Sequence, residues 1–137
     1  MGREARRHLL SPGDAGRQSR ELVRRALEWN VLTFRLMTRA RSDREAVGAA
    51  SFDYLMYSGY VMMAHHWAQM ARRAEGALAT GSAGQTVTFY RSKQQLARFY
   101  FERLLPRADM HRRAALSPAR TLTDRAPETD CDFRRSC

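Results

Sequence analysis

The most constraining feature of this sequence is a stretch without a charged side chain, which runs from Tyr54 to Ala71. It lies within FDYLMYSGYVMMAHHWAQMARRA at residues 52–74. Apolar residues occur around most of the circumference of the helix that this segment predicts, and such a helix has to be covered by other elements. We expect it to be the central element of a helical fold whose other helices leave part of it uncovered.

The first predicted helix spans residues 17–39. Its apolar side chains recur every three or four positions, which is the spacing of one helix face. This stripe consists of Val23, Leu27, Asn30, Phe34 and Met37, and it is widened by Trp29, Val31 and Leu36. We expect the stripe to be the packing face, with the arginines on the other side. Residues 1–16 are expected to form a basic N-terminal loop.

The second predicted helix covers about residues 44–79, and Asp43 is placed to cap its first turn. A glycine-rich turn at residues 80–84 follows it. The third helix covers about residues 86–105 and is expected to end at Pro106, because proline cannot continue a helix interior.

These elements predict an all-α, antiparallel bundle of three main helices within residues 17–110. Residues 111–137 lose the apolar rhythm and alternate charges, so we expect them to form a polar, disordered tail. The 137 residues suffice for one domain.

The chain carries 24 basic and 14 acidic residues, a net charge of +10, and Lys93 is the only lysine. A strongly basic chain invites a nucleic-acid interpretation, but a gathered basic stripe is also needed. Here the arginines are scattered, with most of the excess in the N-terminal third. This pattern disfavours a nucleic-acid partner.

The cysteine content, the N-terminal segment and the uncharged stretch bear on the cellular location of the chain. The two cysteines, Cys131 and Cys137, are too few for a disulfide framework, and the N-terminus has no apolar signal segment. The uncharged stretch is at the short edge of the roughly 20 residues that cross a bilayer, and it includes Ser58, His65 and Gln69. We therefore expect a cytoplasmic chain without a membrane partner.

No catalytic or metal-binding constellation is evident. His65 and His66 are adjacent, so on a helix they point about 100° apart and cannot both bind one metal ion. Asp53 stands at the start of the uncharged stretch, where it could accept hydrogen bonds or pair with an arginine of another helix as a structural feature. We expect no catalytic, cofactor-binding or metal-binding residues.

Two segments carry a family resemblance. DYLMYSGYVMMAHHWAQMARRA at residues 53–74 and FYRSKQQLARFYFERLLPRA at residues 89–108 are joined through a glycine-rich turn. Their order and spacing resemble the C-terminal helical domain of acyl-CoA dehydrogenases, in the 3-methylmercaptopropionyl-CoA dehydrogenase-like branch. The resemblance covers about residues 17–108.

The resemblance implies a function through the parent family. Full-length relatives are oxidoreductases of fatty acid metabolism, flavoproteins that hold FAD in a preceding catalytic portion and oxidise an acyl-CoA thioester. No position of that portion has a counterpart here, so the chain is expected to be a non-catalytic domain, truncated or separately encoded, without FAD of its own. A catalytic portion or self-association would cover its apolar surface. The expected packing or docking residues are Asp53, Tyr54, Gly59, Tyr60, Trp67, Met70, Phe89, Tyr90, Phe99 and Phe101.

The alternative is a small basic helical adaptor that binds an acidic protein or nucleic acid. It requires the arginines of the first helix to gather on one open face. These are Arg20, Arg24, Arg25, Arg35 and Arg39.

Overall fold

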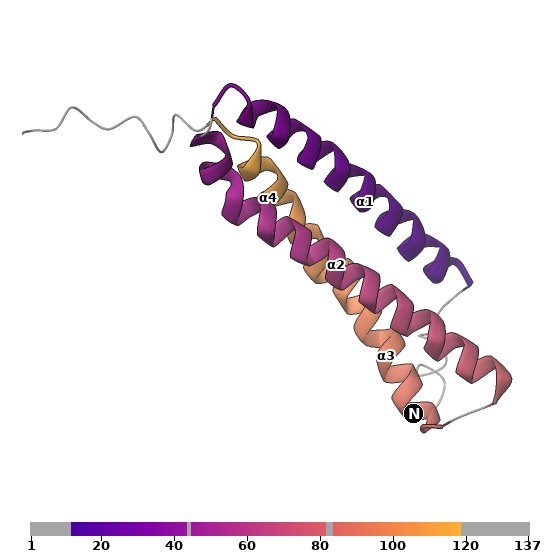
Figure 1. Ribbon diagram of the computed structural model, residues 1–137. Helices are drawn as coiled ribbons and strands as arrows, with labels where there is room; N and C mark the ends of the chain where they lie inside the picture. The colour runs from indigo at the N-terminus through magenta and orange to yellow at the C-terminus, as the bar shows by residue number, and fades with distance from the viewer. Residues whose placement is uncertain (1–11, 44, 82–83, 119–137) are drawn as a thin grey trace, which may run out of the picture.

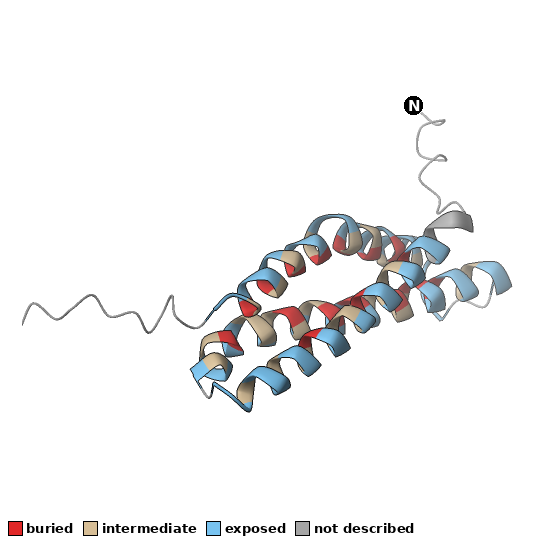
Figure 2. Ribbon diagram, turned by 90° about the horizontal axis from the view of Figure 1, so that it is seen from above, coloured by how far each residue is buried: buried red, intermediate tan, exposed pale blue. Residues whose placement is uncertain are grey.

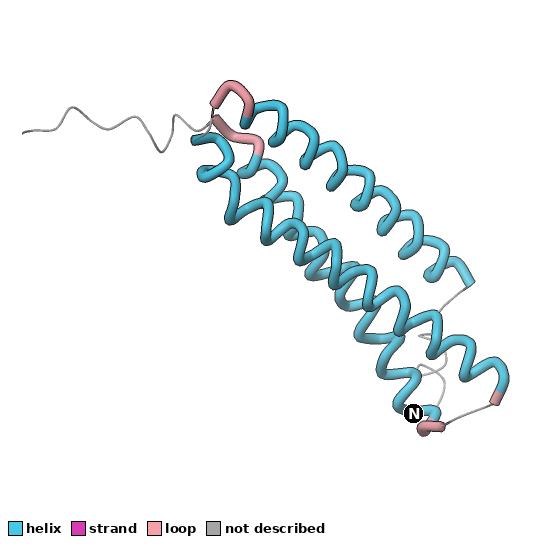
Figure 3. The backbone as a smooth tube through the Cα atoms, in the orientation of Figure 1, coloured by secondary structure: helices cyan, strands magenta, loops and turns pink. Residues whose placement is uncertain are grey.

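The computed structural model describes residues 12–43, 45–81 and 84–118, and every regular element in these ranges is a helix. Figure 1 shows α1 and α2 antiparallel, with the run from α3 to α4 returning along α2. Only short loops join the helices (Figure 3). The predicted all-α bundle of three main helices is confirmed. Its elements are α1 (Pro12–Ala40), α2 (Glu45–Thr80), α3 (Val87–Phe99), the π-helical turn η1 (Tyr100–Leu104), the 3-10 turn η2 (Leu105–Arg107) and α4 (Ala108–Ala115).

The first helix begins earlier than the sequence indicated. α1 starts at Pro12, so the part of the expected loop at residues 12–16 is helical. Proline suits the first turn, since the first amide groups of a helix make no intrahelical hydrogen bond. Residues 1–11 of the expected loop lie outside the described residues.

The ends of α2 follow the predicted chemistry. The Asp43 carboxylate accepts hydrogen bonds from the backbone amides of Glu45 at 3.0 Å and Ala46 at 3.2 Å, which confirms its capping role. After Thr80, Gly81 takes a positive φ of 63°. Glycine adopts this left-handed conformation without steric cost and commonly ends helices.

The third helix does not end at Pro106. The backbone changes from α to π geometry over Tyr100–Leu104, then to one 3-10 turn, and continues as α4. Pro106 lies at the start of the 3-10 turn, where its missing amide proton is tolerated. The buried positions reflect the π turn, because the step from Tyr100 to Leu105 is five residues instead of three or four.

The boundary expected at residue 110 falls inside a helix. α4 runs to Ala115, and both His111 and Ala115 are buried. Residues 111–118 therefore belong to the folded part. The remainder of the predicted tail, residues 119–137, lies outside the described residues.

The core lies along the inward side of α2, which packs against α1, α3 and α4 (Figure 2). Its largest fully buried side chains are Leu32, Tyr57 and Leu105. α2 also buries a series of small side chains, which lets neighbouring helices approach closely. This series is Ala50, Ala64, Ala68, Ala71 and Ala74.

Two buried tyrosines form hydrogen bonds to neighbouring helices through their hydroxyl groups. Tyr57 on α2 donates to the backbone carbonyl of Arg25 on α1 at 3.2 Å. Tyr100 in η1 donates to the carbonyl of Tyr60 on α2 at 2.9 Å. Buried phenols need such partners, so these bonds fix the relative position of the helices as well as satisfying polar atoms.

The apolar stripe predicted as the packing face of α1 faces outward instead. Leu27 is 62% exposed and Phe34 is 69% exposed, and Val23 and Met37 are similarly open. The inward face of α1 is formed by Leu22, Arg25, Trp29, Leu32 and Leu36. The prediction was wrong for the stripe itself, although Trp29 and Leu36, which were expected to widen it, do pack against the core. α1 has two apolar faces, and spacing alone does not tell which one the bundle uses.

Two leucine truncations test this orientation of the helices. Leu105→Ala should lower the free energy of unfolding by about 2–5 kcal/mol, because it leaves a cavity in the core. Leu27→Ala should change it by no more than about 0.5 kcal/mol, because the side chain is exposed. Urea unfolding followed by far-UV circular dichroism measures both, and equal losses would contradict the outward position of Leu27.

Candidate functional site

A buried ion-pair cluster joins α1 to α4. Arg25 is only 2% exposed, and its guanidinium donates to both carboxylate oxygens of Asp109, at 2.5 and 2.9 Å. It also donates to Glu21 at 2.9 Å and to Glu28 at 3.4 Å. The Glu28 carboxylate in turn accepts from the Tyr57 hydroxyl at 3.1 Å. The carboxylates of Asp109, Glu21 and Glu28 thus all pair with the buried guanidinium of Arg25.

The pKa shifts in this cluster keep each group in its ordinary charge state. The hydrogen bonds from Arg25 hold the pKa of Asp109 below its usual value. Burial alone would lower the pKa of Arg25, but Asp109 raises it above the usual value. Burial and the charge of Glu28 raise the pKa of Tyr57 to about 12. All three shifts move away from neutral pH, so each group keeps its charge state there, and the ion pairs that join α1 to α4 persist.

A second polar contact lies where α2 meets α4. Nδ1 of His111 is 2.8 Å from Asp53, and the imidazole stacks on Tyr60 with ring centroids 5.8 Å apart. Asp53 was expected to accept hydrogen bonds or to pair with an arginine of another helix, and its partner is a histidine of another helix instead of an arginine. His111 was not predicted, because residues 111–137 were expected to form a tail. The helical spacing of Ala108, His111 and Ala115 was the available signal.

The His111–Asp53 pair lacks the third member of a hydrolytic triad. Among the interactions of the described residues, no hydroxyl group is hydrogen-bonded to His111. A nucleophile within hydrogen-bond reach of the histidine is what such catalysis requires. The pair therefore connects two helices.

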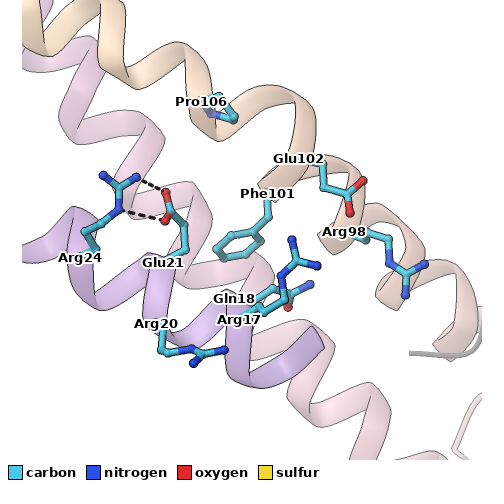
Figure 4. A pocket seen from close by; sticks show the side chains of 9 residues that line it. All are labelled: Arg17, Gln18, Arg20, Glu21, Arg24, Arg98, Phe101, Glu102 and Pro106. Atoms are coloured by element: carbon cyan, nitrogen blue, oxygen red, sulfur yellow. Dashed lines mark hydrogen bonds and ion pairs between the residues drawn. The ribbon is translucent and has the colours of Figure 1, made fainter. Parts of the chain in front are cut away.

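An open hollow of about 460 Å³ lies between the first turns of α1 and the end of α3 (Figure 4). Phe101 points into it, and arginines surround it with two glutamates among them. Arg24 is already paired with Glu21 at 2.6 Å. The mixture of charges gives this hollow no strong preference for an anion. Its full lining is Arg17, Gln18, Arg20, Glu21, Arg24, Arg98, Phe101, Glu102 and Pro106.

The adjacent histidines of α2, His65 and His66, are both exposed. Nε2 of His65 lies 2.8 Å from the side-chain amide nitrogen Nε2 of Gln69. Within the described ranges, no group of three or more histidine, cysteine, aspartate or glutamate side chains could hold a metal ion. The described helices also include none with the length and apolar character that crossing a bilayer would need.

The residues expected to pack or dock divide between core and surface. Tyr54 accepts a hydrogen bond from the Trp29 indole at 3.2 Å, and Trp67 stacks on Tyr100 with ring centroids 6.4 Å apart. Tyr60 and Phe101 pack against the core, and Met70 and Tyr90 are half-buried. The exposed members are Gly59, Phe89 and Phe99.

The outward side of α1 presents an apolar surface, which we call the α1 stripe. Arginines flank it: Arg24 and Arg35 line a hollow of about 300 Å³ together with Leu27 and Val31. Phe34 is its most exposed member, at 69%. The α1 stripe consists of Val23, Leu27, Val31, Phe34 and Met37.

The outward side of α2 presents a second apolar surface, which we call the α2 outer face. Leu55 is 69% exposed and Phe52 is 66% exposed. A side-chain carbon added at Gly59 would meet nothing within 4 Å. The α2 outer face consists of Phe52, Leu55, Gly59, Met62 and Met63.

The five arginines of α1 do not gather on one open face. Arg25 is buried against Asp109, and Arg24 is paired with Glu21 and Glu28. Arg39 donates to the backbone carbonyl of Leu116 at 2.7 Å. The arrangement that the adaptor interpretation requires is therefore not found.

The described residues thus form a helical domain with two exposed apolar surfaces. The family model described as "Acetyl-CoA dehydrogenase C-terminal like" matches residues 7–125. The chain belongs to this family. Comparison with curated proteins and with solved structures gave no match. The family match includes all of the described helices of this acyl-CoA dehydrogenase C-terminal-like domain.

Neighbouring arginines of α1 give a matched test of the buried cluster. Arg25→Ala should lower the free energy of unfolding by about 2–4 kcal/mol, toward the range for breaking a buried ion pair, since Asp109 is partly exposed. Arg24→Ala should lower it by less than about 1 kcal/mol, because its side chain is 50% exposed. Chemical denaturation of both variants measures the difference, and a larger loss for Arg24→Ala would refute the assignment.

The cluster also predicts the pH dependence of stability. Because the pKa of Asp109 is lower in the folded state than its ordinary 3.8, its contribution is present above that pH and is lost as pH falls through the folded pKa. Urea titrations from about pH 6, where the contribution is intact, down to about pH 2 should show this loss. Asp109→Asn should be less stable at pH 6 and should show a smaller further decrease. An unchanged slope in that variant would assign the acid sensitivity to other carboxylates such as Glu21.

Proposed function

We propose that this chain is the non-catalytic helical domain of an acyl-CoA dehydrogenase-like flavoprotein, of the 3-methylmercaptopropionyl-CoA dehydrogenase-like branch. In this proposal the FAD-bearing catalytic portion oxidises the acyl-CoA thioester, and the present domain packs against it. The family membership supports the assignment of this chain as a C-terminal-like domain of that family. The outward direction of the α1 stripe supports the packing role, because large exposed apolar patches mark interaction surfaces.

The α1 stripe is the better surface for the catalytic portion. In full-length relatives that portion precedes the helical domain, so it joins the domain on the side of α1. Arg24 and Arg35 flank Leu27 and Val31 on this surface. A neighbour that matches it would present an apolar patch with acidic side chains around it, since complementary charges favour the correct partner.

A supporting role agrees with the chemistry of the described residues. The polar clusters centred on Arg25 and His111 each join two helices. We infer that acyl-CoA and FAD contact the catalytic portion, and that this domain contributes packing and stability to the assembly.

A binding assay tests the proposal. The purified chain is titrated into a catalytic portion of an acyl-CoA dehydrogenase of the same branch that lacks its own C-terminal domain. We expect binding, and Leu27→Glu should weaken it at least about 10-fold, which corresponds to about 1.4 kcal/mol. Val87→Glu is the control, because Val87 is exposed on α3, away from the stripe.

Two results would overturn the proposal. One is the absence of binding by the unmodified chain. The other is reduction of an electron acceptor by the chain alone with acyl-CoA and added FAD, since this would place the catalytic residues within it.

A further inference from the structure

We propose that the α2 outer face binds the same face of a second copy of this chain, giving an antiparallel dimer with twofold symmetry. This inference goes beyond the proposed function and does not rest on it, because the chain alone is sufficient for the dimer. Four observations support it: the placement of the exposed residues, an unexplained glycine, the absence of charge and the available area.

The exposed residues are arranged evenly about Gly59. Leu55 lies four positions before it and Met63 four positions after it, while Phe52 and His66 lie seven positions before and after. All are exposed. If two antiparallel helices cross at Gly59, Leu55 of each copy meets Met63 of the other, and Phe52 meets His66. A surface that matches itself in this way is what a twofold interface requires.

Gly59, like Gly48 and Gly76 of α2, has no neighbour in the described chain that would require a glycine, but of the three it alone lies between large exposed apolar side chains. It lies in the middle of α2 with helical geometry, and an added side-chain carbon would contact nothing within 4 Å. Glycine at such a position costs about 1 kcal/mol relative to alanine. A close approach by another backbone is one use of glycine, and here that backbone would come from outside the chain.

The absence of charge on the α2 outer face favours a second copy of this chain as its binding partner. The chain as a whole carries +10, so most of its surface disfavours self-association. Between Ala46 and Ala71, however, Asp53 is the only charged residue, and it faces His111 in the bundle. The α2 outer face can therefore meet itself without opposing like charges. Two α1 stripes would instead bring Arg24 and Arg35 of each copy close together.

The area is adequate for a dimer of modest affinity. Phe52 and Leu55 are 66% and 69% exposed, and Met62 and Met63 are 48% and 46% exposed, so the α2 outer face exposes on the order of 450 Å². Two such faces bury about 900 Å², which is below the standard size and in the range of weak or transient interfaces. On the α2 side, an adjoining groove of about 620 Å³, lined by Val47, Ala50 and Leu55 among others, extends the apolar contact.

Sedimentation velocity of the full chain at tens of micromolar tests the dimer. We expect a species of about twice 15.8 kDa. Leu55→Glu should raise the dimer dissociation constant at least 10-fold while retaining its helicity. Phe34→Glu is the matched control, because Phe34 and Leu55 are both 69% exposed but lie on different surfaces. It should remain dimeric.

Cross-linking tests the antiparallel register independently. In a background with Cys131→Ser and Cys137→Ser, Gly59→Cys should give a covalent dimer with a short bis-maleimide. Gly76→Cys is the control: it is also an exposed α2 glycine, but it lies about 25 Å along the helix axis from the crossing. In an antiparallel pair its two copies would be about 50 Å apart and should not cross-link.

Each contrary result overturns the inference. A monomeric unmodified chain excludes the dimer. A dimer that Phe34→Glu dissociates and Leu55→Glu does not would place the interface on the α1 stripe. Cross-linking at position 76 without cross-linking at position 59 would exclude the antiparallel crossing at Gly59.

Discussion

The contact between Arg25 and Asp109 closes the bundle. α1 and α4 each pack mainly on α2 and have few other close contacts with one another, so this ion pair is a principal direct connection between them. Burying an arginine is costly unless it is fully paired, and Asp109, Glu21 and Glu28 surround it. By holding α4 in place, the contact also keeps His111 beside Asp53. These two polar connections of α4, one to α1 and one to α2, therefore support one another.

Much of the fold was predictable because local rules determine it. The uncharged stretch predicts a long central helix, and the carboxylate of Asp43 caps it as its position indicated. The failures concern features that depend on tertiary context. Proline normally ends a helix, but the π turn moves Pro106 to a position where no amide proton is needed. Asp53 contacts His111 only because the helix continues beyond Pro106 into α4. The spacing of residues within α2 could therefore not predict this contact.

The orientation of α1 was unpredictable for a different reason. Leu22, Trp29 and Leu32 form one apolar face, and Val23, Leu27 and Phe34 form another. Both have helical spacing, and only packing against α2 decides between them. The second face remains exposed on the outward side of α1, flanked by arginines, whereas the α2 outer face is uncharged. The two exposed apolar surfaces of this member of the acyl-CoA dehydrogenase C-terminal-like family therefore differ in chemistry.

The π turn between Tyr100 and Leu104 sets which side of the returning helix is buried. It holds one residue more than an α-helical turn would, and this residue sets the five-residue step between the buried Tyr100 and Leu105. An uninterrupted α-helix over the same residues would rotate everything beyond by about 100° relative to α2, moving Leu105, Ala108 and His111 off the buried side. Losing a single residue here would leave a four-residue step, which a regular α-helix places on one face, so this turn should tolerate such a deletion better than an α-helical turn of the core.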